Sequence, residues 1–178
     1  MRIDSGCGLD VSLAAGNMLN LPSQRKQPAM LKKLVDLLYG TTVQEDPHRR
    51  VQRAACVLLL EVAHADNLLM QHELAEVSRS VTERFGLSAQ EALELMEESE
   101  VVRAGSNDLW QFARVINESL SVAEKTGLME DIWRVIYADG RLQNHEDYLV
   151  HKLMDLLRLN HQQFIAAKLK ILAESQAG

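Results

Sequence analysis

Residues 46–66 read DPHRRVQRAACVLLLEVAHAD, and this stretch decides the fold. Asp46 and Pro47 are residue types that cap a helix and occupy its first position, so a helix is expected to begin here and to run to about Asp66. Residues 54–60 are apolar without interruption, so this helix has no polar face along its middle. A helix of this kind is stable only where other elements surround it. We therefore expect it to lie at the centre of the protein.

The chain beyond residue 66 carries the signals of further helices. Ser88 with Glu91, and Ser121 with Glu124, have the spacing of capping boxes, and Gly86 is suited to end the helix before Ser88. No segment alternates apolar and polar residues as a strand does. The sequence predicts an all-α, single-domain bundle of about seven helices, at residues 46–66, 71–85, 89–104, 107–119, 121–138, 144–158 and 161–174. His161 is expected to cap the last helix.

Composition and charge limit the classes of function. The 178 residues correspond to one domain, and the 47% hydrophobic content suits a folded protein. The net charge is −6 and no dense cluster of Lys and Arg stands out, so a nucleic-acid partner is not expected. The longest apolar run is far shorter than the roughly 20 residues that a membrane-spanning helix needs. Cys7 and Cys56 imply no disulfide framework, and the first 30 residues make a poor secretory signal, so we expect a cytoplasmic protein.

The N-terminal part differs from the rest of the chain. Residues 1–29 contain several Gly and Pro and no sustained apolar period, which predicts a flexible extension. The helical pattern begins at Met30 with an amphipathic segment, residues 30–38, so Met30 is also a candidate start of translation. The predicted organisation is an extension at 1–29, a helical domain at 30–174 and a tail at 175–178.

A protein shortened to begin at Met30 is expected to melt at the same temperature as the full chain, within error. The reason is that residues 1–29 offer the bundle no amphipathic helix to pack against it. Thermal unfolding followed by circular dichroism measures this. A clear fall in the melting temperature would show that the extension is part of the folded unit.

One nine-residue pattern occurs twice, 73 residues apart. The pattern A-D-x-x-L-x-x-H-E starts at Ala65 and again at Ala138, and each copy follows a long apolar helix and opens an amphipathic one. Five identities in nine positions indicate an internal repeat. We expect two helix–loop–helix copies related by a pseudo-twofold axis, with Leu60 and Trp133 on facing central helices.

The repeated acidic residues permit two interpretations. Asp66 and Asp139 stand near a helix C-terminus, where the helix dipole disfavours a carboxylate by about 0.3–1 kcal/mol. In the first interpretation each Asp accepts backbone N–H bonds from the next helix, in which Glu73 and Glu146 occupy the third position and complete a reciprocal cap. In the second, the four carboxylates bind Ca²⁺ or Mg²⁺, and only weakly, because tight Ca²⁺ sites need about six to eight oxygen ligands. We favour the first interpretation.

Around these turns the chain resembles the TerB-like tellurite-resistance family, whose fold is similar to the N-terminal domain of DjlA-type membrane co-chaperones. The resemblance rests on the double A-D-(G/N) turn with a Glu seven residues after each Asp. It continues through RFGLS at 84–88, LWQF at 109–112, INE at 116–118, and residues 133–157 and 161–169, so that it covers about residues 30–172. It implies an association with tellurite or metal stress, and it makes the acidic turn residues candidates for metal chelation.

The second copy keeps the family's pattern better than the first. Asn67 stands in the first turn where a Gly is usual, whereas Gly140 in the second turn allows a left-handed conformation and the close approach of a cation. Met70 and Gln143 stand where an acidic residue is common, which removes one oxygen ligand from each turn. The second turn, with Asp139, is therefore expected to matter more in any cation role.

Two further surfaces are candidates for contacts. The glutamates at residues 91–100 form an acidic run, which predicts a solvated helix face or a docking site for a basic segment, and arginines at residues 49, 50 and 53 are expected to meet it within the fold. Trp110 and Phe112 are two residues apart on a predicted helix and cannot share a face. One of them should pack inside the bundle, and the other is a candidate partner contact.

No motif indicates catalysis. The chain has no recognisable nucleophile–base pair, phosphate-binding loop or zinc motif, so we do not expect an enzyme. The sequence favours a non-enzymatic cytosolic module linked to tellurite or metal stress, whose acidic turns are a weak site for a divalent cation. The alternative is a protein-interaction or co-chaperone-like adaptor without a metal role.

Overall fold

The structure is a computed structural model that describes residues 45–65, 71–139 and 144–177. The described residues form seven α-helices and no strand, which confirms the all-α prediction. The helices are α2 (Pro47–Ala63), α3 (Gln71–Phe85), α4 (Ala89–Ala104), α5 (Trp110–Ser119), α6 (Val122–Ile136), α7 (Asn144–Leu156) and α8 (His161–Ala177), with a short 3-10 helix, η1 (Tyr137–Asp139), after α6. The extension at 1–29 and the segment at 30–38 lie outside the described residues, so the boundary at Met30 stays a prediction.

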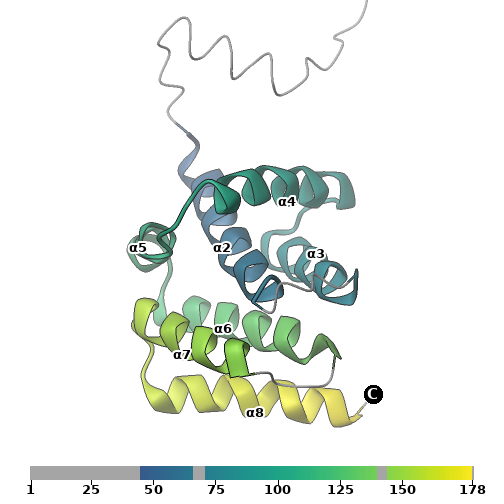
Figure 1. Cartoon of the computed structure of the whole chain (residues 1–178), viewed down its shortest axis with the longest axis vertical. Helices are drawn as coiled ribbons and strands as arrows, with labels where there is room; N and C mark the ends of the chain where they lie inside the picture. The colour runs from purple at the N-terminus through teal and green to yellow at the C-terminus, as the bar shows by residue number, and fades with distance from the viewer. Residues whose placement is uncertain (1–44, 66–70, 140–143, 178) are drawn as a thin grey trace, which may run out of the picture. The chain divides into compact units, whose positions relative to one another are not determined.

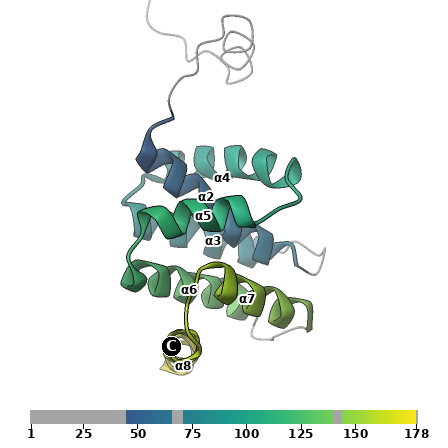
Figure 2. The same ribbon diagram turned by 90° about the vertical axis from the view of Figure 1, so that its left-hand side faces the viewer.

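Helix α2 lies in the interior, as its apolar stretch predicts. The side chain of Asp46 caps it by accepting a hydrogen bond from the backbone N–H of His48, and every residue from 54 to 60 is buried, Cys56 fully. The helix contacts α3, α4, α5 and α6. Figures 1 and 2 both show α2 between α4 on one side and α6 on the other.

Helix α6 is the second buried helix. It packs against α2 and is covered by α8 (Figure 1), and Trp133 at its centre is fully buried, as expected. Leu60 of α2 is buried as well, so the two central helices do face each other. The pseudo-twofold relation between the two copies stays a prediction.

The ends of the helices follow local chemistry. Both predicted capping boxes form, at Ser88 for α4 and at Ser121 for α6. Gly86 adopts a left-handed φ of 63° directly after α3, which is the conformation that glycine favours at this position. Helix α7 ends at Leu156, two residues before the expected boundary, because Arg158 takes the left-handed conformation with φ 56°.

The start of one helix and the cap of another differ from the prediction. Helix α5 begins at Trp110 and not near Asn107, because the Asp108 carboxylate accepts the Trp110 backbone N–H at 2.9 Å and fixes the start there. Helix α8 is capped by Asn160, so the assignment of this role to His161 was wrong. Asn160 Oδ1 accepts from the backbone N–H of Gln163 at 2.9 Å, and the Asn160 N–H donates to Gln163 Oε1 at 2.8 Å. This helix also runs to Ala177, beyond the predicted end at residue 174.

Arginines near the start of α2 meet the acidic run of α4 only in part. Arg49 forms an ion pair with Glu98 of α4 at 3.0 Å, as expected. Arg53 pairs instead with Glu45, at 2.6 Å, just before its own helix. Arg50 has no ion pair within the part of the chain that the structure describes.

Candidate functional site

The two glutamates of the repeated pattern are buried at equivalent positions. Glu73 is the third residue of α3 and Glu146 the third residue of α7, as predicted. Glu73 is 5% exposed and Glu146 2%, and both have interaction partners. A carboxylate in the first turn of a helix is stabilised by the helix dipole, but its burial is costly unless neighbouring groups hold it. Both carboxylates are therefore fixed in place rather than solvated.

The aspartates of the same pattern cannot be placed beside these glutamates. Asp66 and the side chain of Asp139 lie outside the described residues, and the backbone of Asp139 ends η1. In the ranges 45–65, 71–139 and 144–177, no group of three or more His, Cys, Asp or Glu is arranged to hold a metal ion. The structure thus describes the side chains of only two of the four predicted ligands, Glu73 and Glu146, and not those of Asp66 and Asp139. The cation site stays a prediction.

An ion-pair network centred on the buried Asp131 joins α3, α6 and α8. Arg84 donates from Nε and Nη2 to Oδ2 of Asp131, each at 2.5 Å. Asp131 Oδ1 also accepts from Arg134 at 2.8 Å, and Arg134 donates to Glu174 of α8 at 3.0 Å. Gly127 leaves the space for this arrangement, because a Cβ at this position would lie 3.1 Å from Arg84 Nη2. No sequence pattern points to this network, since Arg84 and Asp131 are far apart in the chain and form no motif.

The electrostatic balance of this network is set by burial. Burial raises the pKa of the Asp131 carboxyl above its usual value, although Arg84 and Arg134 pull it down. The penalty for taking this carboxylate out of water thus exceeds the attraction of the two arginines. Asp131 therefore depends on both arginines to remain charged inside the fold.

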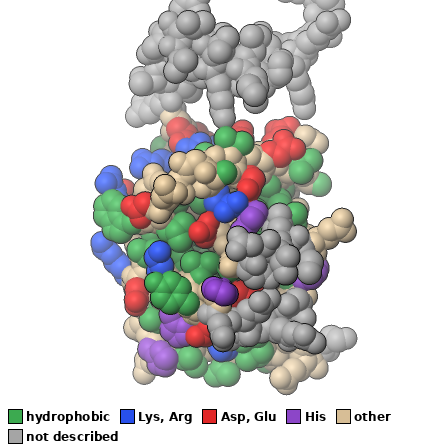
Figure 3. All heavy atoms as spheres, viewed as in Figure 1, with side chains coloured by type: hydrophobic (Ala, Val, Ile, Leu, Met, Phe, Trp, Pro, Cys, Tyr) green, Lys and Arg blue, Asp and Glu red, His purple; other side chains and the backbone are tan. Residues whose placement is uncertain are grey.

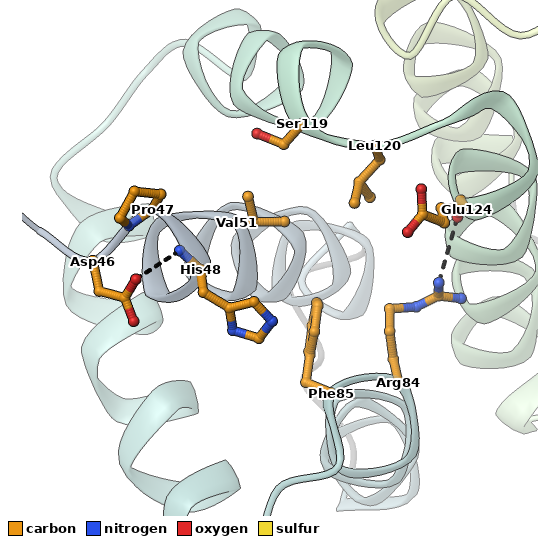
Figure 4. Close-up of a pocket in the computed structure, with 9 residues that line it drawn as sticks. All are labelled: Asp46, Pro47, His48, Val51, Arg84, Phe85, Ser119, Leu120 and Glu124. Carbon is orange, nitrogen blue, oxygen red and sulfur yellow. Dashed lines mark hydrogen bonds between the residues drawn. The ribbon is translucent and has the colours of Figure 1, made fainter.

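A pocket of about 630 Å³ lies where four helix ends meet (Figure 4). It is bordered by the starts of α2 and α6 and by the ends of α3 and α5. Pro47, Val51, Phe85 and Leu120 supply its apolar wall. No sequence signal pointed to this pocket, because its residues come from four separate segments.

The aromatic pair on α5 is divided between the core and the surface, as the two-residue spacing predicts. Phe112 is 8% exposed and packs in the core, which removes it as a candidate partner contact. Trp110 is 53% exposed, and the Arg114 guanidinium lies 5.7 Å from the centre of its indole ring. Arg114 also pairs with Glu118 at 2.9 Å. Trp110 thus remains the candidate contact on this helix.

The surface charge is mixed where Figure 3 shows it. Lys and Arg side chains are interspersed with Asp and Glu on this face. Neutralising a nucleic-acid backbone needs Lys and Arg gathered on one surface, so this face lacks that character. None of the described helices combines the length and the apolar character needed to cross a membrane.

Comparison with known proteins identifies the family. Residues 52–169 match the family described as tellurite resistance protein TerB. The chain belongs to this family. No curated protein and no solved structure matches the chain. The TerB match begins inside α2 and ends inside α8, so it includes both acidic turns and the Arg84–Asp131 ion pair. It confirms the TerB resemblance, whereas the similarity to DjlA-type co-chaperones stays a prediction.

Proposed function

We propose that this TerB-family protein is a non-enzymatic cytoplasmic module that acts in the response to tellurite or metal stress. The family match carries the proposal, since it spans both copies of the acidic pattern. In a cell that carries the gene, its deletion is expected to increase sensitivity to tellurite, and the intact chain should restore growth. Equal growth of the deleted and parental strains on tellurite would contradict the proposal.

In this proposal the main role of the acidic turns is structural: they stabilise the helices that follow them. Their binding of Ca²⁺ or Mg²⁺ is weak. The burial of Glu73 and Glu146 directly after the two turns supports a structural role, because carboxylates at these positions satisfy helix N-termini. Two carboxylates in each turn supply too few oxygens for tight binding, so affinities in the millimolar range are expected.

Asp139→Asn is expected to lower the free energy of unfolding by about 1–2 kcal/mol, or roughly 2–8 °C in the melting midpoint, through the loss of a charge-assisted hydrogen bond. The decrease should be the same in EDTA and in about millimolar Ca²⁺, Mg²⁺ or Zn²⁺, because weak binding adds little stability at that concentration. Thermal melts of the parent, Asp139→Asn and Asp66→Asn under these conditions measure it. A metal-dependent shift in the parent that is lost in Asp139→Asn alone would make Asp139 a ligand of a functional cation site.

A second candidate function is that of an adaptor, and the exposure of Trp110 favours it. Large aromatic residues frequently anchor protein interfaces, and this one is exposed and already lies against an arginine. Trp110→Ala should leave the melting temperature unchanged and should reduce the capture of a specific protein from cells of the source organism. Tyr148→Ala is the matched control, because Tyr148 is 73% exposed on α7. Equal capture by both variants and the parent would exclude Trp110 as the anchor.

A further inference from the structure

The pocket between the four helix ends is open to solvent and has the volume of a small-molecule site. Its volume of about 630 Å³ lies within the usual range of roughly 300–1,000 Å³ for such sites. Arg84 on its wall is held by Asp131 and also approaches the backbone oxygen of Glu124, at 3.4 Å. The capping box at the start of α6 fixes the Glu124 carboxylate. The pocket is thus formed before any ligand enters, which lowers the entropic cost of binding.

The two basic side chains on the pocket wall, Arg84 and His48, both contact other side chains of the protein. Asp131 neutralises the charge of Arg84 from behind the wall. The Gln52 amide nitrogen lies 3.1 Å from His48 Nδ1, so this imidazole already contacts a side chain of its own helix. The charge of Arg84 is therefore paired with a carboxylate before any ligand binds.

The two acidic side chains on the wall retain acceptor capacity. Glu124 uses Oε2 to accept from the backbone N–H and the hydroxyl of Ser121, at 2.7 and 2.6 Å, while Oε1 accepts no hydrogen bond from any described residue. Asp46 uses Oδ1 for the backbone N–H of His48, at 3.1 Å, and Oδ2 has no donor in the described ranges. The Ser121 bonds lower the pKa of Glu124, which keeps it ionised. A helix N-terminus offsets only about half a charge at each site, so the uncompensated charge is negative.

We propose that this pocket binds a small organic cation, with an apolar or aromatic body and a protonated amine. The body packs against Val51, Phe85 and Leu120, and the ammonium group donates to Glu124 Oε1. In Figure 4 the Glu124 carboxylate and the Phe85 ring border the same space, so one ligand could contact both.

The full chain, labelled with ¹⁵N, is titrated with three probes of similar shape: 2-phenylethylammonium, neutral 2-phenylethanol and anionic 3-phenylpropionate. We expect saturable shifts of the amide resonances of the pocket residues with the ammonium probe. The neutral probe should bind roughly three- to tenfold more weakly, and the anion more weakly still. Equal or tighter binding of the neutral or anionic probe would overturn the proposal, as would shifts that map elsewhere on the protein.

Matched variants test the carboxylates without removing the helix caps. Glu124→Gln retains a capping residue of the same shape, and Asp46→Asn retains an N-cap. Each is expected to weaken binding of the ammonium probe by roughly three- to tenfold. Glu91→Gln is the control, because Glu91 forms the equivalent capping box on α4 and does not line the pocket. Unchanged affinity in both pocket variants, or an equal loss in Glu91→Gln, would overturn the proposal.

Discussion

Replacing Trp133 with alanine should lower the free energy of unfolding by about 3–5 kcal/mol. The indole is fully buried, stacks on Tyr137 with ring centres 5.6 Å apart, and packs against Phe164 at 5.3 Å. Nζ of Lys168, a residue of α8, lies 4.7 Å from the centre of the indole ring. The indole N–H has no hydrogen-bond partner among the described residues, so the loss is one of packing and not of a hydrogen bond. Alanine would leave a cavity that rigid helices fill only in part.

Denaturant unfolding followed by far-ultraviolet circular dichroism measures the loss. Trp110→Ala is the control, because this tryptophan is 53% exposed and its removal opens no cavity. The control should change the free energy of unfolding by less than about 0.5 kcal/mol. A similarly small effect for Trp133→Ala would show that α6 and α8 do not pack around this side chain.

Arg84→Met should lower the free energy of unfolding by about 3 kcal/mol, because it leaves the buried Asp131 with one arginine in place of two. Asp131→Asn should cost less. Burial already raises the pKa of this carboxyl, so the site tolerates a neutral side chain better than a charge with too few partners. The double variant Arg84→Met/Asp131→Asn should therefore recover part of the loss. A double variant no more stable than Arg84→Met would contradict this account.

The effect of Arg84→Met should also depend on pH. The substitution removes the Arg84 guanidinium, which lowers the pKa of Asp131. The pKa of Asp131 should therefore rise further above its value in the unfolded chain. A carboxyl with a raised pKa destabilises the folded state above that pKa, and the penalty is lost as the pH falls through it. The deficit relative to the parent should thus be smaller at acidic than at neutral pH. An equal deficit at acidic and neutral pH would mean that Asp131 stays charged in the variant.

Much of the secondary structure is encoded locally. Asp46 with Pro47, and the pairs Ser88–Glu91 and Ser121–Glu124, fix three helix starts through bonds that span two or three residues, and all of them form. The two wrong predictions, the start of α5 and the cap of α8, also have local causes. Asp108 accepts from the backbone N–H of Trp110 at the start of α5, and Asn160, not His161, caps α8.

The family and the burial of particular side chains also followed from the sequence alone. The apolar stretch at 54–60 and the repeated turn determined that α2 and α6 are buried and that the chain is a TerB-family protein. Only the tertiary structure decided that Arg84 meets Asp131, that Phe112 and not Trp110 enters the core, and that four helix ends border a pocket. Apolar periodicity states which face of a helix is buried. It does not determine the angle at which two helices cross or the point along each helix where they touch. This crossing geometry decides which distant charges and helix ends come together.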